Sequence, residues 1–291
     1  MIPRSCEYYA PGTLDEAVSL LQKLGPDAKI LSGGQSLIPM MKLRLASPPH
    51  IVDINCIPGL DYISEVDGTL RIGALVRESD LERSDLVKSR CPILIDTTSV
   101  IADPLVRNQA TVCGNLAHGY PANDHPATML ALGAVLIAVG PTGQREMPIE
   151  DFFPGLFTTA LQADEILKEI RITIPPPSSG GAYLKLERKV GDYATAGVAV
   201  QITLNKSGAC ERAGVGLTNV GFTPLKARQT EAFLKGKTLD DAVIRQAAVL
   251  AAGESQPVDD IRGSADYKRD LVRVLGARAL KLALARAKGG T

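Results

Sequence analysis

The sequence predicts an α+β protein of two domains, and three observations lead to this prediction. The 291 residues exceed the usual size of a single domain. Helix-like and strand-like apolar segments alternate in the first half, whereas strand-like segments followed by long helix-like ones fill the last third. Residues 175–181 (PPPSSGG) contain three prolines, which oppose helix and central strand. We therefore expect one domain over residues 1–176, itself subdivided, and a second over residues 177–291.

The first expected element is a helix over residues 14–24. Thr13 and Glu16 have the spacing of a capping box, and apolar side chains recur at helical intervals after them. The dipeptide Gly25-Pro26 then ends the pattern. This segment is predicted to be an amphipathic helix that packs on the first strands.

Further elements follow in the first domain. Short apolar runs predict buried strands, and a short amphipathic helix is expected over residues 79–89. The segment 97–126 is rich in Gly, Asn, Pro and Asp and has little periodicity, which favours a long irregular segment with a functional role. The expected strand-like or buried segments are residues 28–31, 51–54, 70–75, 129–139 and 165–174.

The second domain is predicted to be a sheet followed by helices. Three segments with strand character, residues 183–188, 197–204 and 212–220, favour an antiparallel meander. Two helices are expected after them, over residues 238–253 with Thr238 as the cap and over residues 264–288, which keeps one apolar stripe.

Composition excludes several classes of protein. The chain is 45% hydrophobic and 22% charged, which is typical of a globular protein and not of a disordered one. Its 32 basic and 32 acidic residues cancel, so it lacks the basic surface that nucleic acids or anionic membranes require. The longest strongly apolar stretch, residues 129–139, is shorter than the roughly 18 residues of a spanning helix. Because the first residues lack an apolar signal core, we expect a cytoplasmic protein.

The cysteines and histidines predict no metal site. Five cysteines are scattered without a C-x-x-C pair, which indicates reduced thiols and excludes ligation of an iron–sulfur cluster or zinc. His118 and His125 form the nearest histidine pair, but their spacing with Asp124 does not match a metal-binding helix face. We predict no metal ligand and no catalytic residue in this chain.

Two glycine-containing segments are candidates for binding an anion. Ser32-Gly33-Gly34-Gln35-Ser36 follows a predicted strand, where adjacent glycines let backbone amides converge on phosphate oxygens, although a tight structural turn explains it equally well. The second segment, residues 111–115 (TVCGN), combines a glycine with small hydrogen-bonding side chains. Asp124 could accept a hydrogen bond from a ribose hydroxyl, but ordinary loop chemistry explains this segment too.

Together these segments resemble a known family. Residues 30–39 (ILSGGQSLIP), 111–115 (TVCGN) and 185–196 (KLERKVGDYATA) are similar to motifs of the FAD-binding medium subunits of the molybdenum hydroxylase (xanthine dehydrogenase) family. Within it, the medium chains of aerobic carbon monoxide dehydrogenases form the most similar branch, and the similarity runs along nearly the whole chain. The resemblance implies a PCMH-type FAD-binding domain of two α+β subdomains with the cofactor between them. A C-terminal domain of three-stranded antiparallel sheet plus helical bundle is implied to follow.

The resemblance also implies which residues contact FAD. The two glycine-containing segments are implied to hold the pyrophosphate, Tyr193 to lie beside the isoalloxazine, and Asp124 and Lys185 to bind polar parts of the cofactor. Tyr193 could instead be a core aromatic with its hydroxyl paired. Asp124 could merely cap the turn before Pro126, and Lys185 could be a solvated residue on a strand. The implied contacts are Leu31, Ser32, Gly33, Gly34, Gln35, Ser36, Leu37, Ile101, Thr111, Gly114, Asn115, His118, Asp124, Leu167, Lys185 and Tyr193.

The chain departs from the family pattern at two positions. Cys113 stands where the family has a glycine, so a Cβ is costly there if the position needs a positive φ or a close approach to phosphate. Tyr120 stands where an acidic or small residue is common. These departures affect the expected contacts of the phosphate and of the adenosine end.

The implied function is electron transfer. Electrons from iron–sulfur clusters of a small partner would pass through FAD to an external acceptor, while a large partner with a molybdenum centre oxidises the substrate. The resemblance implies a dimer of such heterotrimers, of the carbon monoxide dehydrogenase type.

Alternatives to this assignment are the FAD subunit of an N-heterocycle, purine or aldehyde dehydrogenase, a stand-alone flavin oxidase, and a non-enzymatic nucleotide-binding scaffold. A flavin spectrum distinguishes the scaffold from the others, and co-purification with two further chains distinguishes a subunit from an oxidase.

Overall fold

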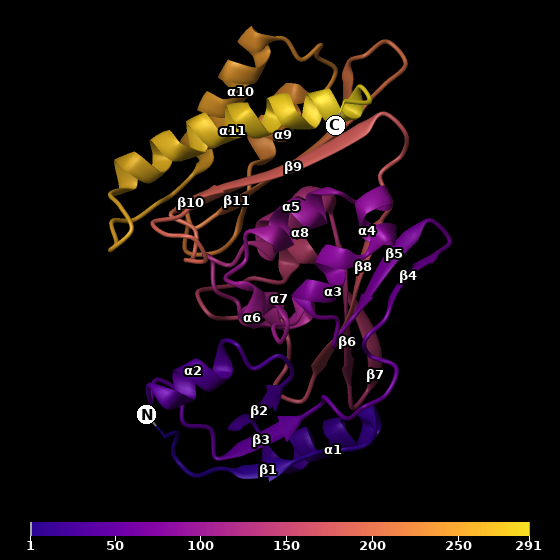
Figure 1. The fold of residues 1–291 in the computed structure, drawn as a ribbon, viewed down its shortest axis with the longest axis vertical. Coiled ribbons are helices and arrows are strands. Elements are labelled where there is room, and N and C mark those ends of the chain that lie inside the picture. The colour runs from indigo at the N-terminus through magenta and orange to yellow at the C-terminus, as the bar shows by residue number, and fades with distance from the viewer. Residues whose placement is uncertain (1, 291) are drawn as a thin grey trace.

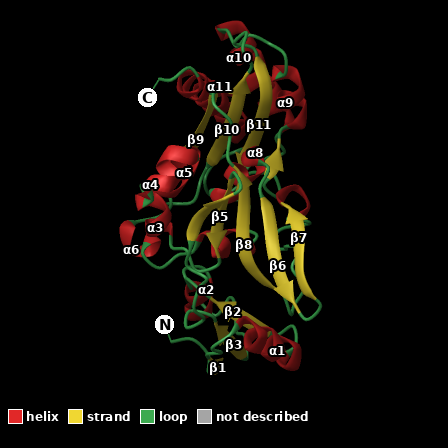
Figure 2. Ribbon diagram, turned by 90° about the vertical axis from the view of Figure 1, so that its right-hand side faces the viewer, coloured by secondary structure: helices red, strands yellow, loops and turns green. Residues whose placement is uncertain are grey.

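The computed structural model describes residues 2–290, and three β-sheets follow one another along the long axis of this part of the chain (Figures 1 and 2). Each sheet has its own helices, and three separate clusters of buried apolar side chains lie beneath them. The expected α+β architecture, with two subdomains and a C-terminal sheet with helices, is confirmed.

The first subdomain is a three-stranded parallel sheet covered by one amphipathic helix. The strand order is β1(Glu7–Tyr9), β3(His50–Asp53), β2(Ala28–Leu31), and α1(Leu14–Leu24) buries Ala17, Val18 and Leu21. The hydroxyl of Thr13 accepts the amide of Glu16 at 3.1 Å, as predicted. The carboxylate of Glu16, however, accepts the amide of Gly12 at 2.7 Å rather than that of the cap residue. The predicted helix over residues 14–24 and the strand over residues 28–31 are confirmed.

The second subdomain contains a five-stranded antiparallel sheet with helices on it. The strands are β4(Ile63–Val66), β5(Thr69–Gly73), β8(Ile166–Thr173), β6(Val135–Gly140) and β7(Gly143–Pro148), in that order across the sheet. The helices are α3(Glu78–Arg83), α4(Asp85–Arg90), α5(Ile93–Ser99), α6(Pro104–Arg107), α7(Val112–Ala117), α8(His125–Leu132) and the 3-10 turn η1(Ile149–Asp151). The short helix α2(Leu37–Lys42) precedes them and leads out of the first glycine loop.

Three predictions for this subdomain are wrong in detail. The helix expected over residues 79–89 is two helices, because the hydroxyl of Ser84 caps α4 and starts a new helix. Much of the segment 97–126 is helical, in turns too short to show periodicity. The run 129–139 begins as helix α8, which ends at Gly133 with φ 65° before β6 starts. Since α8 is buried on nearly all sides, its sequence lacks the polar face that marks a helix.

The C-terminal part is an antiparallel sheet packed between helices, with four strands rather than the expected three, because a two-residue strand at residues 225–226 pairs with one edge. The strand order is β12(Leu225–Lys226), β11(Cys210–Thr218), β10(Ala196–Leu204), β9(Ser179–Leu186), followed along the chain by α9(Arg228–Leu234), α10(Asp241–Glu254) and α11(Ala265–Ala287). Ser264 caps α11, but α10 is capped by Asp240 and not by Thr238 as predicted. Strand β9 begins at Ser179, inside the predicted border run, and is an edge strand that the three prolines precede.

Glycines let two helices approach this sheet closely from opposite faces. A Cβ at Gly214 or Gly216 would lie 1.9–2.0 Å from carbonyl oxygens of α8, and one at Gly180 would lie 2.1 Å from the carbonyl oxygen of Ala283 in α11. Figure 1 shows α11 lying along β9. The C-terminal sheet therefore rests directly on α8 of the second subdomain, which brings the loop after β9 toward the preceding loops.

Candidate functional site

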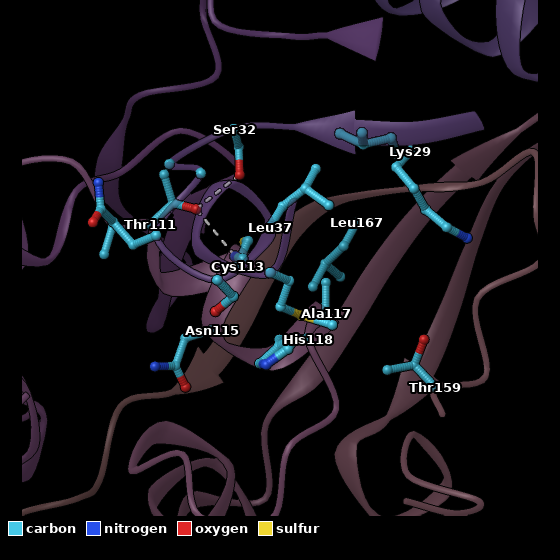
Figure 3. A pocket seen from close by; sticks show the side chains of 18 of the residues that line it. Lys29, Ser32, Leu37, Thr111, Cys113, Asn115, Ala117, His118, Thr159 and Leu167 are labelled. Carbon is cyan, nitrogen blue, oxygen red and sulfur yellow. Dashed lines mark hydrogen bonds between the residues drawn. The ribbon is translucent and has the colours of Figure 1, made fainter. Parts of the chain in front are cut away.

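A cavity of about 940 Å³ lies where the first subdomain, the second subdomain and the loop after β9 meet. Figure 3 shows side chains from both glycine loops directed toward it. Most of the residues predicted from the sequence line it. They are Ser32, Gly33, Gly34, Gln35, Ser36, Leu37, Ile101, Thr111, Gly114, Asn115, His118, Asp124, Leu167 and Tyr193.

Two predicted residues stand behind the wall of this cavity. Leu31 is the last residue of β2, and its side chain lies under Gly34. Lys185 does not line the cavity itself, but its Nζ donates to Asp124 Oδ2 and to the carbonyl oxygen of Asp192, both at 3.1 Å, and these two residues do line it.

The first glycine loop offers unpaired backbone donors to the cavity. Gly34 has φ 72°, the left-handed region that a glycine adopts without strain, and the chain then turns into α2. Across the described residues 2–290, the amides of residues 33–36 have no hydrogen-bond acceptor, although all four residues line the cavity. Unpaired amides that converge on one space favour a bound anion.

The first glycine loop, residues 32–36, packs against the second, which spans residues 109–115 and includes the first turn of α7. A Cβ at Gly33 would lie 2.4 Å from the carbonyl oxygen of Gln109, so this glycine is required by the contact between the loops. The hydroxyls of Ser32 and Thr111 lie 3.1 Å apart, and the Thr111 hydroxyl also accepts the amide of Gly114 at 3.1 Å (Figure 3). The sequence predicted the ligand-binding use of Gly33 but not this packing, which joins residues far apart along the chain.

The second loop leaves a polar atom unsatisfied at the cavity. The Oδ1 atom of Asn115 is buried and has no partner among the described residues, while its backbone carbonyl accepts Asn123 Nδ2 at 2.7 Å. An unsatisfied buried acceptor beside unpaired amides is the arrangement expected where a polar ligand completes the site. The volume and the donors together suit a large ligand with a phosphate group.

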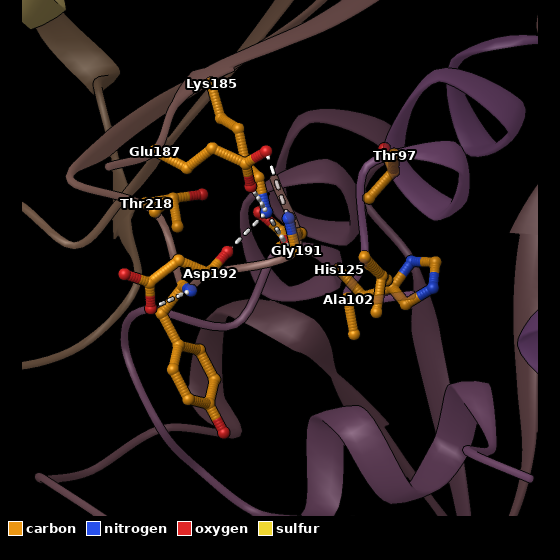
Figure 4. Close-up of polar contacts among 12 residues, drawn as sticks. Thr97, Ala102, His125, Lys185, Glu187, Gly191, Asp192 and Thr218 are labelled. Atoms are coloured by element: carbon orange, nitrogen blue, oxygen red, sulfur yellow. Dashed lines mark hydrogen bonds and ion pairs between the residues drawn. The ribbon is translucent and has the colours of Figure 1, made fainter. Parts of the chain in front are cut away.

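Asp124 is the centre of a buried polar cluster at the cavity wall, and Figure 4 shows Lys185 and Asp192 of this region close together. Its Oδ1 accepts the Tyr183 hydroxyl at 2.6 Å, and its Oδ2 accepts Lys185 Nζ. Burial raises the pKa of Asp124, although the nearby Lys185 ammonium opposes this rise. Asp124 makes no side-chain cap to α8, and the side chain of Lys185 is only 2% exposed. The alternatives of a turn cap and of a solvated lysine are therefore wrong.

Aromatic side chains line the side of the cavity next to Tyr193. Its ring is 39% exposed, lies edge-on to Tyr120 at 5.0 Å between centroids, and has the Arg262 guanidinium 5.5 Å away. Tyr120 in turn stacks on Phe157 at 4.9 Å. Tyr193 is therefore not a core aromatic. Phe157, the partner of Tyr120, gave no signal in the sequence, because this pair joins two separate loops.

The two histidines of this region have different surroundings. His118 lines the cavity, and burial lowers its pKa, so its imidazole is neutral at neutral pH. His125 is fully buried behind the cavity, where its Nε2 lies 2.7 Å from the carboxylate of Glu78. Among residues 2–290, no group of three His, Cys, Asp or Glu side chains could hold a metal ion.

Cys113 is accommodated without strain. It is the second residue of α7, is 3% exposed, and its Sγ lies 3.7 Å from the carbonyl oxygen of Gly73. Because the position is helical, it needs no positive φ, and burial raises the pKa of the thiol far above the neutral range. The cost that a positive φ would impose on a Cβ is therefore absent, whereas the effect of Cys113 on the approach of phosphate stays an expectation, because Cys113 lines the cavity.

Within residues 2–290, every helix is too short or too polar to cross a lipid bilayer.

Comparisons with known proteins agree with this geometry. A family model described as the FAD binding domain in molybdopterin dehydrogenase matches residues 4–177, and one described as the CO dehydrogenase flavoprotein C-terminal domain matches residues 181–283.

Similar proteins cover nearly the whole chain. The carbon monoxide dehydrogenase medium chain of Hydrogenophaga pseudoflava is 45% identical, over 98% of this chain and 99% of its own. The 6-hydroxypseudooxynicotine dehydrogenase complex subunit alpha of Paenarthrobacter nicotinovorans is 36% identical, over 99% and 97%. A solved structure of the Hydrogenophaga carbon monoxide dehydrogenase superposes with a TM-score of 0.96, covering 98% of this chain and 99% of that one. The chain therefore belongs to the molybdenum hydroxylase family, as one of its FAD-binding subunits.

Proposed function

We propose that this chain is the electron-transfer subunit of a molybdenum hydroxylase of the carbon monoxide dehydrogenase type. It takes electrons from iron–sulfur clusters of a small partner subunit and passes them through FAD to an external acceptor. When bound, FAD supplies the ability to accept two electrons and release them again. The observation that carries the proposal is the cavity between the two glycine loops, with its unpaired amides, in a chain of this family.

The residues of the chain would bind and orient the cofactor. The amides of residues 33–36 and the segment that includes Gly114 and Asn115 suit the pyrophosphate, because both present polar groups to the same cavity. Asp124 is an acceptor for a ribose or polyol hydroxyl, held in place by Tyr183 and Lys185. We propose that Lys185 acts through Asp124 rather than by direct contact, since it does not line the cavity.

The remaining predicted contacts are proposed as apolar or ring contacts. Leu37, Ile101 and Leu167 line the cavity with aliphatic groups, and His118 presents a neutral imidazole. Tyr193 lies on an exposed loop at the cavity and would cover the isoalloxazine. We keep residues 1–176 and 177–291 as the proposed domains.

The proposed partners are an iron–sulfur small subunit and a molybdopterin large subunit, in a dimer of heterotrimers. Neutral net charge is compatible with a cytoplasmic location, which we propose as well. The 45% identical relative is named for carbon monoxide and the 36% identical one for 6-hydroxypseudooxynicotine. Carbon monoxide is therefore the favoured substrate of the complex, and an N-heterocycle, purine or aldehyde is the alternative.

Identification of the bound flavin tests the cofactor proposal. The purified chain should be yellow and should release FAD into the supernatant on acid precipitation, at one per chain, because the Cys113 thiol at the cavity is buried and its raised pKa makes it a poor nucleophile. Chromophore that stays in the pellet, or FMN in the supernatant, would contradict it.

Electron transfer is tested with the isolated chain and the assembled complex. The isolated chain should not oxidise the substrate of the complex but should exchange electrons between its flavin and external acceptors. Tyr193→Ala should alter flavin reoxidation more than reduction within the complex, as measured by stopped-flow spectroscopy. Substrate turnover by the lone chain would instead identify a stand-alone oxidase.

A further inference from the structure

Arg77 occupies the junction between the two subdomains, behind both glycine loops. It is the N-cap residue of α3, the first helix of the second subdomain, whereas Asn55 follows β3 at the end of the first. Neither residue lines the cavity, and neither was singled out in the sequence. Their side chains nevertheless meet across the junction.

The guanidinium of Arg77 joins the two loops through two separate donors. Its Nη1 donates to the carbonyl oxygen of Gln109 at 2.7 Å, and its Nη2 donates to Asn55 Oδ1 at 2.6 Å. The Nδ2 atom of Asn55 then donates to the carbonyl oxygen of Ser32 at 2.8 Å. A continuous chain of hydrogen bonds thus runs from the first glycine loop to the second.

The two ends of this series of hydrogen bonds lie at the groups that set the spacing of the two glycine loops. The Gln109 carbonyl is the group that faces Gly33 most closely, and Ser32 is the residue whose hydroxyl meets Thr111. Asn55 is itself fixed, because its amide and its Nδ2 both donate to Asp53 Oδ1, at 2.8 and 2.6 Å. The planar guanidinium presents its donors in a rigid fork, so neither loop can shift without breaking a bond.

We propose that Arg77 is a positioning residue for the cofactor, which acts through Asn55 and Gln109 to hold the two glycine loops at their binding distance. The inference rests on the proposed function, since it concerns the affinity of the same cavity for FAD. Arg77 does not touch the cavity and is not a catalytic residue. Without this bridge the loops gain freedom, and binding must then order them at a cost in affinity.

The shape of the guanidinium matters more here than its charge. Both of its acceptors are neutral, and the Asp53 carboxylate lies on the other side of Asn55, where it accepts from the Asn55 amide and Nδ2. Lysine at this position keeps the charge but cannot span both acceptors.

The test compares FAD affinity across four variants of the full chain, stripped of flavin and titrated with FAD by fluorescence. Arg77→Gln and Asn55→Ala should each weaken FAD binding about 10- to 100-fold, the range for loss of hydrogen bonds to a charged group. Arg77→Lys should fall between Arg77→Gln and the parent chain. The double variant Arg77→Gln/Asn55→Ala should be no weaker than the worse single variant, because both changes break the same bridge.

A second arginine of the same domain provides the matched control. Arg171 forms ion pairs with Glu146 and Glu169 but bonds to neither glycine loop. Arg171→Gln should lower the unfolding temperature while FAD affinity stays within twofold. The circular dichroism of the bound flavin should change in the Arg77 variants and not in this control.

The outcomes separate the inference from the proposed function. Parent-like affinity in Arg77→Gln, additive losses in the double variant, or equal loss of affinity in Arg171→Gln would each overturn the positioning role. If Arg77→Gln does not fold, Asn55→Ala and Arg77→Lys decide the question by the same affinities. Failure of the parent chain itself to bind FAD would refute the proposed function, and the inference with it.

Discussion

Replacing Gly33 by alanine tests how closely the two glycine loops must pack. A Cβ at this position would lie 2.4 Å from the carbonyl oxygen of Gln109 and 2.8 Å from the amide nitrogen of Thr111. The first distance is about 1 Å shorter than an ordinary van der Waals contact. Both neighbours are backbone atoms and cannot rotate away, so one loop must move as a unit.

The expected magnitude follows from that displacement. Overpacking a tightly packed site costs typically about 1–3 kcal/mol of folding stability. The same movement lengthens the 3.1 Å contact between the Ser32 and Thr111 hydroxyls and separates the groups that line the cavity on either side. We therefore expect Gly33→Ala to weaken FAD binding by about tenfold or more, which corresponds to roughly 1.4 kcal/mol.

The assay combines a fluorescence titration of the flavin-free chain with FAD and a denaturant unfolding curve. Gly253→Ala is the matched control, because a Cβ at this exposed position in α10 meets no atom within 4 Å. It should leave FAD affinity unchanged and raise stability by about 0.5–1 kcal/mol. A Gly33→Ala chain with parent-like affinity and stability would refute the packing argument.

Three further predictions concern groups outside the glycine loops. Tyr183→Phe should destabilise the chain by about 1–3 kcal/mol in urea unfolding, because it leaves the buried Oδ1 of Asp124 unpaired; a neutral result would show that the hydroxyl is dispensable. The hydrogen bond from Lys226 in the C-terminal domain lowers the pKa of Glu150. The stability that this pair adds is therefore present above the unfolded pKa near 4.3 and is lost as the pH falls through the lowered folded pKa. Glu150→Gln should therefore cost up to about 1 kcal/mol at pH 7 and progressively less as the pH is lowered below the unfolded pKa, and a difference that stays constant during this acidification would contradict the assignment. Thiol titration of the native chain should count only Cys6 and Cys56, with all five cysteines reacting after denaturation; a third fast thiol would show that a buried cysteine opens to solvent.

Local signals in the sequence predicted elements well where they were strong. The helix over residues 14–24 has a cap, a regular apolar face and a terminating glycine, and all three depend only on residues within one or two turns. The helix over residues 264–288 was predicted from its apolar stripe alone, which is also a local signal. Prediction was wrong over residues 97–126 and 129–139, because short or fully buried helices have no polar face to reveal their period.

The sequence by itself determined the family, the FAD cofactor and the two glycine loops, since these depend on short motifs whose residue types are required wherever the loops lie. Tertiary structure alone decided why Gly33 must be a glycine, that Lys185 serves Asp124, and that Arg77 joins the loops. The hydroxyls of Ser32 and Thr111 meet across 79 positions of the chain. No periodicity or spacing reports such a contact, because it arises only when the packing of separate subdomains brings their loops together.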